Sequence, residues 1–366
     1  MLSETELLLL NCLIYLVDGE IPDGVKVKNV VDLQVKRFLG ESLTNKSQND
    51  LNLGDTPILD NEIIMTSRSE WTTVLLSFYL HPKLMNYRIY SSVDSTKKNP
   101  KNINQQSQER DLCAFAVVER KFMPLDINYI FQGTMTVAGW DDNEQSFYTA
   151  DTPENKLTQE YFKKSKFYKY VNLQGFLKGL PSPKITFSGH SKGGARALYL
   201  TVCNANNKHL AKKINRCVMF DSGIASQIVS TYSNELSEMS SRIFSIAASK
   251  DPVHGMNEIV EKVKYSYLAT GQQPNIAYYH KPSILLNPKT GLLYPETEDS
   301  DMAKFLYLFC HKMDNTWSEE KKKRFLKGMM VILKYLTSIT DGTENIIDVL
   351  KAMPELAELI PWLTYK

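Results

Sequence analysis

Residues 184–194 read Lys-Ile-Thr-Phe-Ser-Gly-His-Ser-Lys-Gly-Gly, and this stretch decides the fold. A short β-branched and aromatic run leads into the pattern Gly-x-Ser-x-Gly, and good helix formers follow over 195–200. The stretch therefore predicts a strand, a sharp turn and a helix, with Ser191 at the tip of the turn. Side chains two residues before and after the tip would collide with their neighbours, and the glycines Gly189 and Gly193 avoid that collision.

A serine in this position is a candidate nucleophile. The helix that follows it directs free N–H groups and the positive end of its dipole to the place where an oxyanion would form. We therefore expect Ser191 to attack a carbonyl carbon and the N–H of Lys192 to be one donor to the oxyanion. The alternative is a glycine-rich turn between a strand and a helix that carries an incidental serine.

The composition narrows the class of protein. The chain has 366 residues, of which 43% are hydrophobic and 23% are charged. This length suits one large α/β domain of about 250 residues with additions. The net charge of +2 argues against a nucleic-acid partner. The five cysteines are scattered and mostly lie in apolar runs, which predicts buried free thiols and neither a disulfide framework nor a zinc site.

The N-terminal apolar run from Leu7 to Val17 differs from a secretory signal. Asn11 interrupts it, and Glu4 and Glu6 stand where such a signal carries positive charge. The run is also too short to span a bilayer. We expect a cytoplasmic location, or export without a Sec signal peptide.

Strand and helix patterns alternate through the middle of the chain. Apolar runs predict core strands at 112–118, 127–131, 217–220 and 243–247. A helix predicted over 156–177 leads to the strand that begins at Lys184. The alternation predicts an α/β fold with a doubly wound, mostly parallel sheet.

Helical additions are expected at both ends of this core. We divide the chain into an N-terminal helical segment, the core with a mobile polar excursion at 91–110, and a C-terminal helical extension; these parts span 1–60, 61–295 and 296–366. Within them, apolar spacing predicts further helices at 7–16, 25–38, 69–80, 343–353 and 354–360. Asn287 to Gly291 predicts a hairpin turn. Thr316 and Glu319 predict a capping box before a helix that reaches Ile339.

A serine hydroxyl needs a histidine base, which in turn needs a carboxylate to orient it. In this type of fold the acid and then the histidine follow the serine. Three of the six histidines precede the serine or any candidate acid, and His254 lies in the same turn as one candidate acid. We favour His280, which follows a strand-like run at 275–279, over His311, which follows an apolar helical segment.

Two aspartates could be the acid. Asp251 follows the second strand after the elbow helix, where α/β hydrolases usually place the acid, and we favour it. Asp221 follows the strand before and is the alternative. The second oxyanion donor should come from the loop after an earlier strand, and Gly133-Thr134 is well placed for this. We expect the Thr134 N–H, helped by its hydroxyl, to contact the oxyanion.

These residues carry a resemblance to a known family. Phe131-Gln132-Gly133-Thr134 resembles the Phe-Arg-Gly-Thr motif of class 3 lipase-like α/β hydrolases, and 189–194 resembles their Gly-His-Ser-x-Gly-Gly elbow. Lysine after the serine is similar to a bacterial branch whose members are presumed lipases or esterases. The resemblance covers about 110–282 and implies an α/β-hydrolase fold. Gln132 replaces the usual arginine and its salt bridge, and Ala195-Arg196 stands where that branch often has Asn-Leu.

The residues and the resemblance together predict a serine hydrolase of carboxylic esters, in which Ser191, His280 and Asp251 form the triad. A lipase or phospholipase acting on lipid acyl esters, with contact to a membrane surface, is the first interpretation. A thioesterase or peptidase of the same fold, or a catalytically silent hydrolase fold that serves as a binding module, are the alternatives. The chemistry requires no metal or cofactor.

Overall fold

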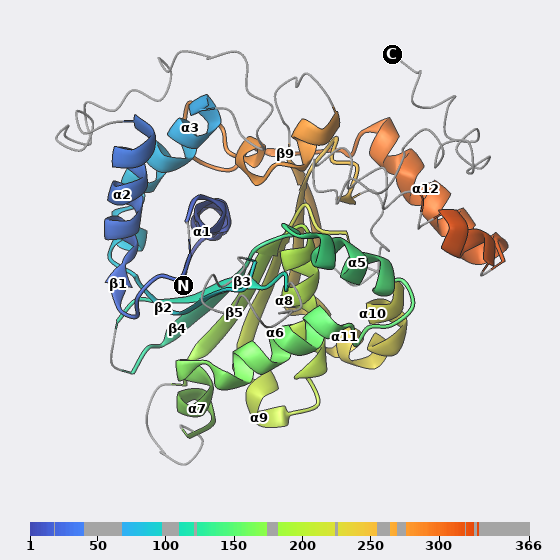
Figure 1. The fold of residues 1–366 in the computed structure, drawn as a ribbon, viewed down its shortest axis with the longest axis horizontal. Coiled ribbons are helices and arrows are strands. Elements are labelled where there is room, and N and C mark those ends of the chain that lie inside the picture. Colours follow the sequence, from blue (N-terminus) through green and yellow to red (C-terminus); the bar gives the residue numbers. More distant parts are fainter. Residues whose placement is uncertain are drawn as a thin grey trace, which may run out of the picture.

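The computed structural model describes residues 1–17, 19–39, 68–96, 110–120, 123–173, 182–223, 226–254, 264–268, 276–318, 320–325 and 328. Within these residues one sheet runs through the molecule (Figure 1). It has nine strands, which lie side by side in sequence order. The strands are β1 Val25–Lys26, β2 Arg88–Asp94, β3 Cys113–Val118, β4 Asp126–Phe131, β5 Lys184–His190, β6 Ile214–Phe220, β7 Ile243–Ala248, β8 Lys264–Leu268 and β9 Glu296–Thr297.

The centre of the sheet is parallel. Strands β4 to β8 all pair in parallel, and antiparallel pairs extend the sheet on either side. The register sets Phe131 beside Gly189 and His190 beside Phe220, so the ends of β4, β5 and β6 lie next to one another. Because the carboxyl ends of parallel strands meet at one edge, the loops that follow these strands gather there.

Helices cover both faces of the sheet (Figure 1). The α-helices are α1 Glu4–Leu16, α2 Val27–Leu39, α3 Arg68–Tyr79, α4 Pro82–Met85, α5 Val137–Gln145, α6 Pro153–Lys164, α7 Lys166–Leu173, α8 Lys192–Cys203, α9 Lys208–Ala211, α10 Ser226–Thr231, α11 Ser233–Met239 and α12 Asp301–Thr316. The 3-10 helices are η4 Ser240–Arg242, η6 Ile276–His280 and η7 Pro282–Leu285. One core joins α1, α2 and α3 to one face, and a second core joins α6 to α11 to the other. This layered arrangement is an α/β-hydrolase fold, as the alternation of patterns predicted.

Helix α1 is the most deeply enclosed of the N-terminal elements. Ser3 and Glu6 form a capping box at its start, which satisfies two of the free N–H groups there. Its apolar residues are buried around the whole circumference, as expected of a helix that is hydrophobic on all sides. No helix among the described residues is long and apolar enough to cross a membrane.

Several predicted elements are confirmed within a few residues: α1, α2, α3, the hairpin at Leu286 and Leu293, and the strands β3 to β7. The helix predicted over 156–177 is in fact two helices, α6 and α7, because the chain is extended at Ser165. The predicted three-part division stays a prediction; β1 and β9, from its first and last parts, belong to the same sheet. The helices predicted over 343–353 and 354–360 lie outside the described residues.

Three local predictions were wrong. The polar excursion predicted at 91–110 starts too early, because residues 91–94 complete β2; residues 97–109 lie outside the described part. The strand predicted before His280 is the 3-10 helix η6. Thr316 ends α12 and does not begin a helix, whereas the Ser318 hydroxyl accepts the N–H of Lys321 (3.3 Å) and caps the next turn.

Candidate active site

The turn after β5 has the geometry of a nucleophile elbow. Ser191 has φ 55° and ψ −127°, a strained conformation that costs about 1–3 kcal/mol and that the surrounding packing must hold in place. A Cβ on Gly189 would lie 2.0 Å from the Gly193 carbonyl, and a Cβ on Gly193 would lie 2.1 Å from the Phe131 oxygen. The two glycines therefore allow the helix, the turn and β4 to approach one another as closely as they do.

The structure brings together the serine, the histidine and the acid that the sequence singled out. His280 Nε2 lies 2.9 Å from Ser191 Oγ, and His280 Nδ1 lies 2.9 Å from Asp251 Oδ1. Since a carboxylate only accepts hydrogen bonds, Nδ1 carries the proton and Nε2 is free to accept the serine proton. His311, the other candidate histidine, lies within α12. The histidine that contacts Ser191 is His280.

Asp251 is fully buried, and backbone N–H groups hold its carboxylate. The N–H of His254 donates to Oδ2 (2.7 Å), and the N–H of Val253 donates to Oδ1 (3.2 Å). His254 thus serves the acid through its backbone, in the turn where the sequence placed it. The His280 side chain is 21% exposed whereas that of Asp251 is inaccessible. The His280 side chain is therefore open to a molecule that enters the site, whereas the Asp251 side chain is closed to it.

A second buried carboxyl lies in the loop before. Asp221 has φ 45°, and the N–H of Ala248 donates to its Oδ1 (2.8 Å); its Oδ2 has no partner among the described residues. Burial raises the pKa of both Asp221 and Asp251, and the proximity of Asp251 raises that of Asp221 further. Three N–H groups donate to the Asp251 carboxylate and one donates to that of Asp221. The negative charge is therefore better stabilised on Asp251, and Asp221 is the one of the two that more readily holds a proton.

Burial also acts on the base. It lowers the pKa of His280 to about 4, so the imidazole is neutral at pH 7. A neutral imidazole with its proton on Nδ1 is the form that a general base requires. The hydrogen bond from His280 Nδ1 to Asp251 and the lowered pKa of His280 therefore indicate the same protonation state.

The loop after β4 lies against the elbow. A Cβ on Gly133 would come within 3.1 Å of the Ser191 Cβ, which shows how closely the two segments approach. Asn143 Nδ2 donates to Thr134 Oγ1 (2.9 Å), so the threonine hydroxyl keeps its own proton available as a donor. Among the described residues, neither the Thr134 N–H nor the Lys192 N–H has an acceptor. Two donors are thus free beside the serine.

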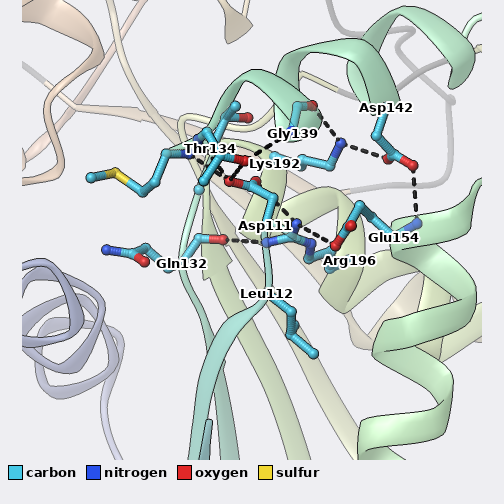
Figure 2. A network of polar contacts seen from close by, with 12 residues as sticks. Asp111, Leu112, Gln132, Thr134, Gly139, Asp142, Glu154, Lys192 and Arg196 are labelled. Carbon is cyan, nitrogen blue, oxygen red and sulfur yellow. Dashed lines mark hydrogen bonds and ion pairs between the residues drawn. The ribbon is translucent and has the colours of Figure 1, made fainter. Parts of the chain in front are cut away.

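A buried network of charges holds this loop, which we call the oxyanion loop (residues 132–139), against the elbow helix (Figure 2). Asp111 Oδ1 accepts the N–H groups of Met135 and Thr136, both at 2.9 Å. Arg196 donates to the Gln132 carbonyl (3.0 Å) and to Asp111 Oδ2 (3.2 Å). Arg196 therefore holds the start of the loop and Asp111 holds its middle.

The second half of the network starts at Lys192. Its Nζ donates to Asp142 Oδ2 (2.6 Å) and to the Gly139 carbonyl (3.0 Å), both on α5. Glu154 lies 3.7 Å from Arg196. Burial raises the pKa of Glu154, although Arg196 opposes the shift. Arg196 and Lys192 thus each lie within ion-pair distance of a buried aspartate.

The sequence did not single out Arg196, Asp111 or Asp142. From the family resemblance we noted only that Gln132 replaces the usual arginine and that Ala195-Arg196 replaces the Asn-Leu common in that branch. The Gln132 side chain points toward α1, where its Nε2 lies 3.5 Å from the Ile14 carbonyl, and the arginine that secures the loop comes from α8 (Figure 2). An arginine inside the apolar run Ala195–Leu200 was the available signal, because a buried guanidinium needs a carboxylate.

Comparisons with known proteins place this geometry in a family. No curated protein matches the chain. Among solved structures, the crystal structure of M37 lipase is 13% identical, over 75% of this chain and 93% of that one, with a TM-score of 0.32. The extracellular lipase LipA from Serratia marcescens is 12% identical over 74% of this chain, with a TM-score of 0.31, and the match spans 42% of LipA. Both likenesses are remote.

A protein family also matches the middle of the chain. The sequence description of the Mbeg1-like family matches residues 95–285. These residues run from the end of β2 to the end of η7 and include Ser191, Asp251 and His280. The narrower resemblance to a bacterial branch stays a prediction. Because the match covers more than half of its residues, the chain belongs to the Mbeg1-like family.

Proposed function

We propose that this protein is a serine hydrolase that cleaves carboxylic esters, with lipid acyl esters as its substrates. The observation that carries the proposal is the continuous hydrogen-bonded series from Ser191 Oγ through His280 to the buried Asp251, built on a strained elbow. An incidental serine in a turn would not be expected to have a neutral imidazole 2.9 Å from its hydroxyl. The Mbeg1-like family is lipase-like, which supports the same class of reaction.

In the first half of the reaction, Ser191 Oγ attacks the ester carbonyl carbon while His280 Nε2 takes the hydroxyl proton. The carbonyl oxygen becomes an oxyanion, which the N–H groups of Thr134 and Lys192 stabilise. The Asp251 carboxylate stabilises the imidazolium that forms on His280. The tetrahedral intermediate then collapses, and the alcohol leaves with the proton that His280 returns to it.

In the second half, water attacks the acyl group on Ser191, and His280 again takes the proton. The carboxylic acid leaves and the serine hydroxyl is restored. The buried charges of Arg196 and Lys192 take no part in these transfers, because both are held by carboxylates. Their contribution is the position of the oxyanion loop.

The experiment that tests the reaction is labelling with a fluorophosphonate, which reacts with an activated serine. We expect one labelled site, Ser191, and no labelling of Ser191→Ala, whose kcat on an ester should fall by roughly 10⁶. Ser165→Ala, which removes another buried hydroxyl, is the matched control and should be labelled like the unmodified chain. Full labelling of Ser191→Ala would reject the proposal, and no labelling of the unmodified protein would favour a silent binding module.

The lipid part of the proposal has its own test. A long acyl chain that enters an apolar site buries more methylenes than a short one, each worth about 0.8 kcal/mol. Part of this energy is realised in the transition state, so kcat/KM for p-nitrophenyl esters should rise with acyl length and increase again with micelles or vesicles. If kcat/KM is highest for the acetate ester and does not change with micelles or vesicles, the result would instead indicate a small-ester esterase, a thioesterase or a peptidase.

A further inference from the structure

A tyrosine from the N-terminal helix lies inside the candidate active site. Tyr15 is on α1, outside the residues 95–285 that match the family. The N–H of Gly133, in the oxyanion loop, donates to the Tyr15 hydroxyl oxygen (2.9 Å). The same hydroxyl lies 2.8 Å from His190 Nδ1, on the residue just before the serine. One side chain therefore touches the oxyanion loop and the elbow together.

His190 continues these contacts to the base. Its Nε2 lies 2.8 Å from the carbonyl oxygen of His280, and its ring lies 5.0 Å from the His280 ring. A carbonyl can only accept, so His190 Nε2 carries a proton. In the neutral imidazole Nδ1 is then bare and accepts the Tyr15 O–H, which leaves the tyrosine oxygen to accept the Gly133 N–H. Every donor in the series has an acceptor.

The protonation states fit this direction of donation. Burial lowers the pKa of His190 well below its ordinary value, so the imidazole is neutral at pH 7. Burial raises the pKa of Tyr15, so its hydroxyl keeps the proton that it donates. The direction Gly133 to Tyr15 to His190, and from His190 to the His280 carbonyl, therefore holds across the neutral range.

A buried hydrogen bond fixes helix α1 against the elbow strand β5. Asn11 Nδ2 donates to Ser188 Oγ on β5 (2.9 Å), in a fully buried contact. Asn11 and Tyr15 are four residues apart, so they lie on the same face of the helix and both face the elbow strand. A Cβ on Gly133 would lie 2.6 Å from the Tyr15 hydroxyl, so only glycine leaves room for this contact.

We propose that Tyr15 and His190 are positioning residues that tie the oxyanion loop to the backbone of His280 through one series of hydrogen bonds. The inference rests on the proposed hydrolase function. The oxyanion donors and the general base must both have fixed positions relative to the same carbonyl carbon. This series of hydrogen bonds joins the oxyanion loop to the backbone of His280 and so fixes the two relative to each other. Loss of the Tyr15 hydroxyl leaves the Gly133 N–H and His190 Nδ1 without partners, and both ends of the site move.

The variant that tests this is Tyr15→Phe, which removes only the hydroxyl. We expect kcat to fall roughly 100-fold with KM nearly unchanged, since a displacement of about 1 Å in reacting groups has an effect of this size. Tyr129→Phe is the matched control: it removes a buried hydroxyl that bonds Ser165 (2.7 Å) and should keep kcat. An equal kcat for Tyr15→Phe and the unmodified enzyme would overturn the proposal.

The role of His190 has its own comparison. His190→Gln retains an N–H that can reach the His280 carbonyl, whereas His190→Ala removes it. We expect His190→Gln to keep more of the kcat than His190→Ala at similar melting temperature. The same kcat in both variants would contradict a role through the donated hydrogen bond.

A third measurement is independent of activity. In ¹⁵N-histidine NMR spectra of Ser191→Ala, His190 should be neutral with its proton on Nε2, and Tyr15→Phe should shift its Nδ1 resonance. A proton on Nδ1 of His190 would refute the series of hydrogen bonds. If the unmodified protein hydrolyses no ester, the proposed function fails, while this spectrum still decides whether the series exists.

Discussion

The two sides of Ser191 are held in place by different kinds of interaction. On the base side, N–H groups and the neutral His280 hold Asp251, and no described lysine or arginine forms an ion pair with it. On the oxyanion side, Asp111 and Asp142 are paired with the buried cations Arg196 and Lys192. The base side thus contains no permanent positive charge paired with its acid, and the oxyanion side contains two.

The difference follows from what each side does in the proposed reaction. His280 gains a positive charge during each step, and Asp251 stabilises it best when no fixed cation already satisfies the carboxylate. The oxyanion loop gains no charge of its own and needs only a fixed position. Buried ion pairs suit that purpose, since removal of either partner leaves an uncompensated charge. Substitution of the acid on the base side should therefore lower kcat, whereas loss of a buried ion pair on the oxyanion side should also lower the free energy of unfolding.

The largest expected effect is on the base side. Asp251→Asn should lower kcat by about 10⁴, because the amide favours the wrong tautomer of His280. Asp221→Asn is the matched control, since it keeps an acceptor for the Ala248 N–H and replaces a carboxyl whose charge burial disfavours. Steady-state kinetics of the two variants measure the contrast. A larger loss for Asp221→Asn would transfer the acid to the earlier strand.

The next effect is on the oxyanion side. Arg196→Met should lower the free energy of unfolding by about 3–5 kcal/mol, because Asp111 is left buried without its cation. Arg120→Met, at a surface pair in which the arginine is 55% exposed, should cost under about 1 kcal/mol. Urea denaturation measures both.

A double variant sharpens this test. Asp111→Asn keeps an oxygen for the N–H groups of Met135 and Thr136 but removes the charge. Arg196→Met combined with Asp111→Asn should therefore be more stable than Arg196→Met alone. Strictly additive losses would mean that the two residues do not stabilise each other.

The smallest expected effect concerns pH. With a pKa of about 4, His280 stays neutral as the pH falls from 8 to 6, and kcat/KM should change by less than about twofold over this range. An ordinary histidine, with a pKa of about 6.5, would lose about three quarters of its neutral form by pH 6. A pH profile of kcat/KM separates the cases, and a decline centred near 6.5 would contradict the effect of burial.

The fold, and the grouping of Ser191, His280 and Asp251 that the structure brings together, were accessible from the sequence because local pattern determines them. The elbow around Ser191 needs glycines at fixed spacing, and Asp251 follows a strand at a position that the topology fixes. His280 was chosen for the wrong local reason, since its predecessor is a 3-10 helix and not a strand. Its order in the chain sufficed, because order fixes which loop reaches the serine.

The supporting residues were inaccessible for a physical reason. Asp111 and Arg196 are 85 positions apart, and Tyr15 and His190 are 175 apart, so no local period links them. His190 was set aside as a base because it precedes the serine, and that argument did not address whether it positions other residues. Contacts of this kind become visible only when the fold brings the segments together.

The enclosure of α1 also affects how the protein is made. On a ribosome α1 emerges before its partners on β5, which follow about 175 residues later, and at 5–20 residues per second this is a delay of roughly 9–35 s. For that time a helix whose apolar residues are buried on all sides in the fold lacks β5 to cover it. Exposed surface of this kind binds chaperones or other nascent chains. We therefore expect refolding from denaturant to be slow and its yield to fall as the protein concentration rises.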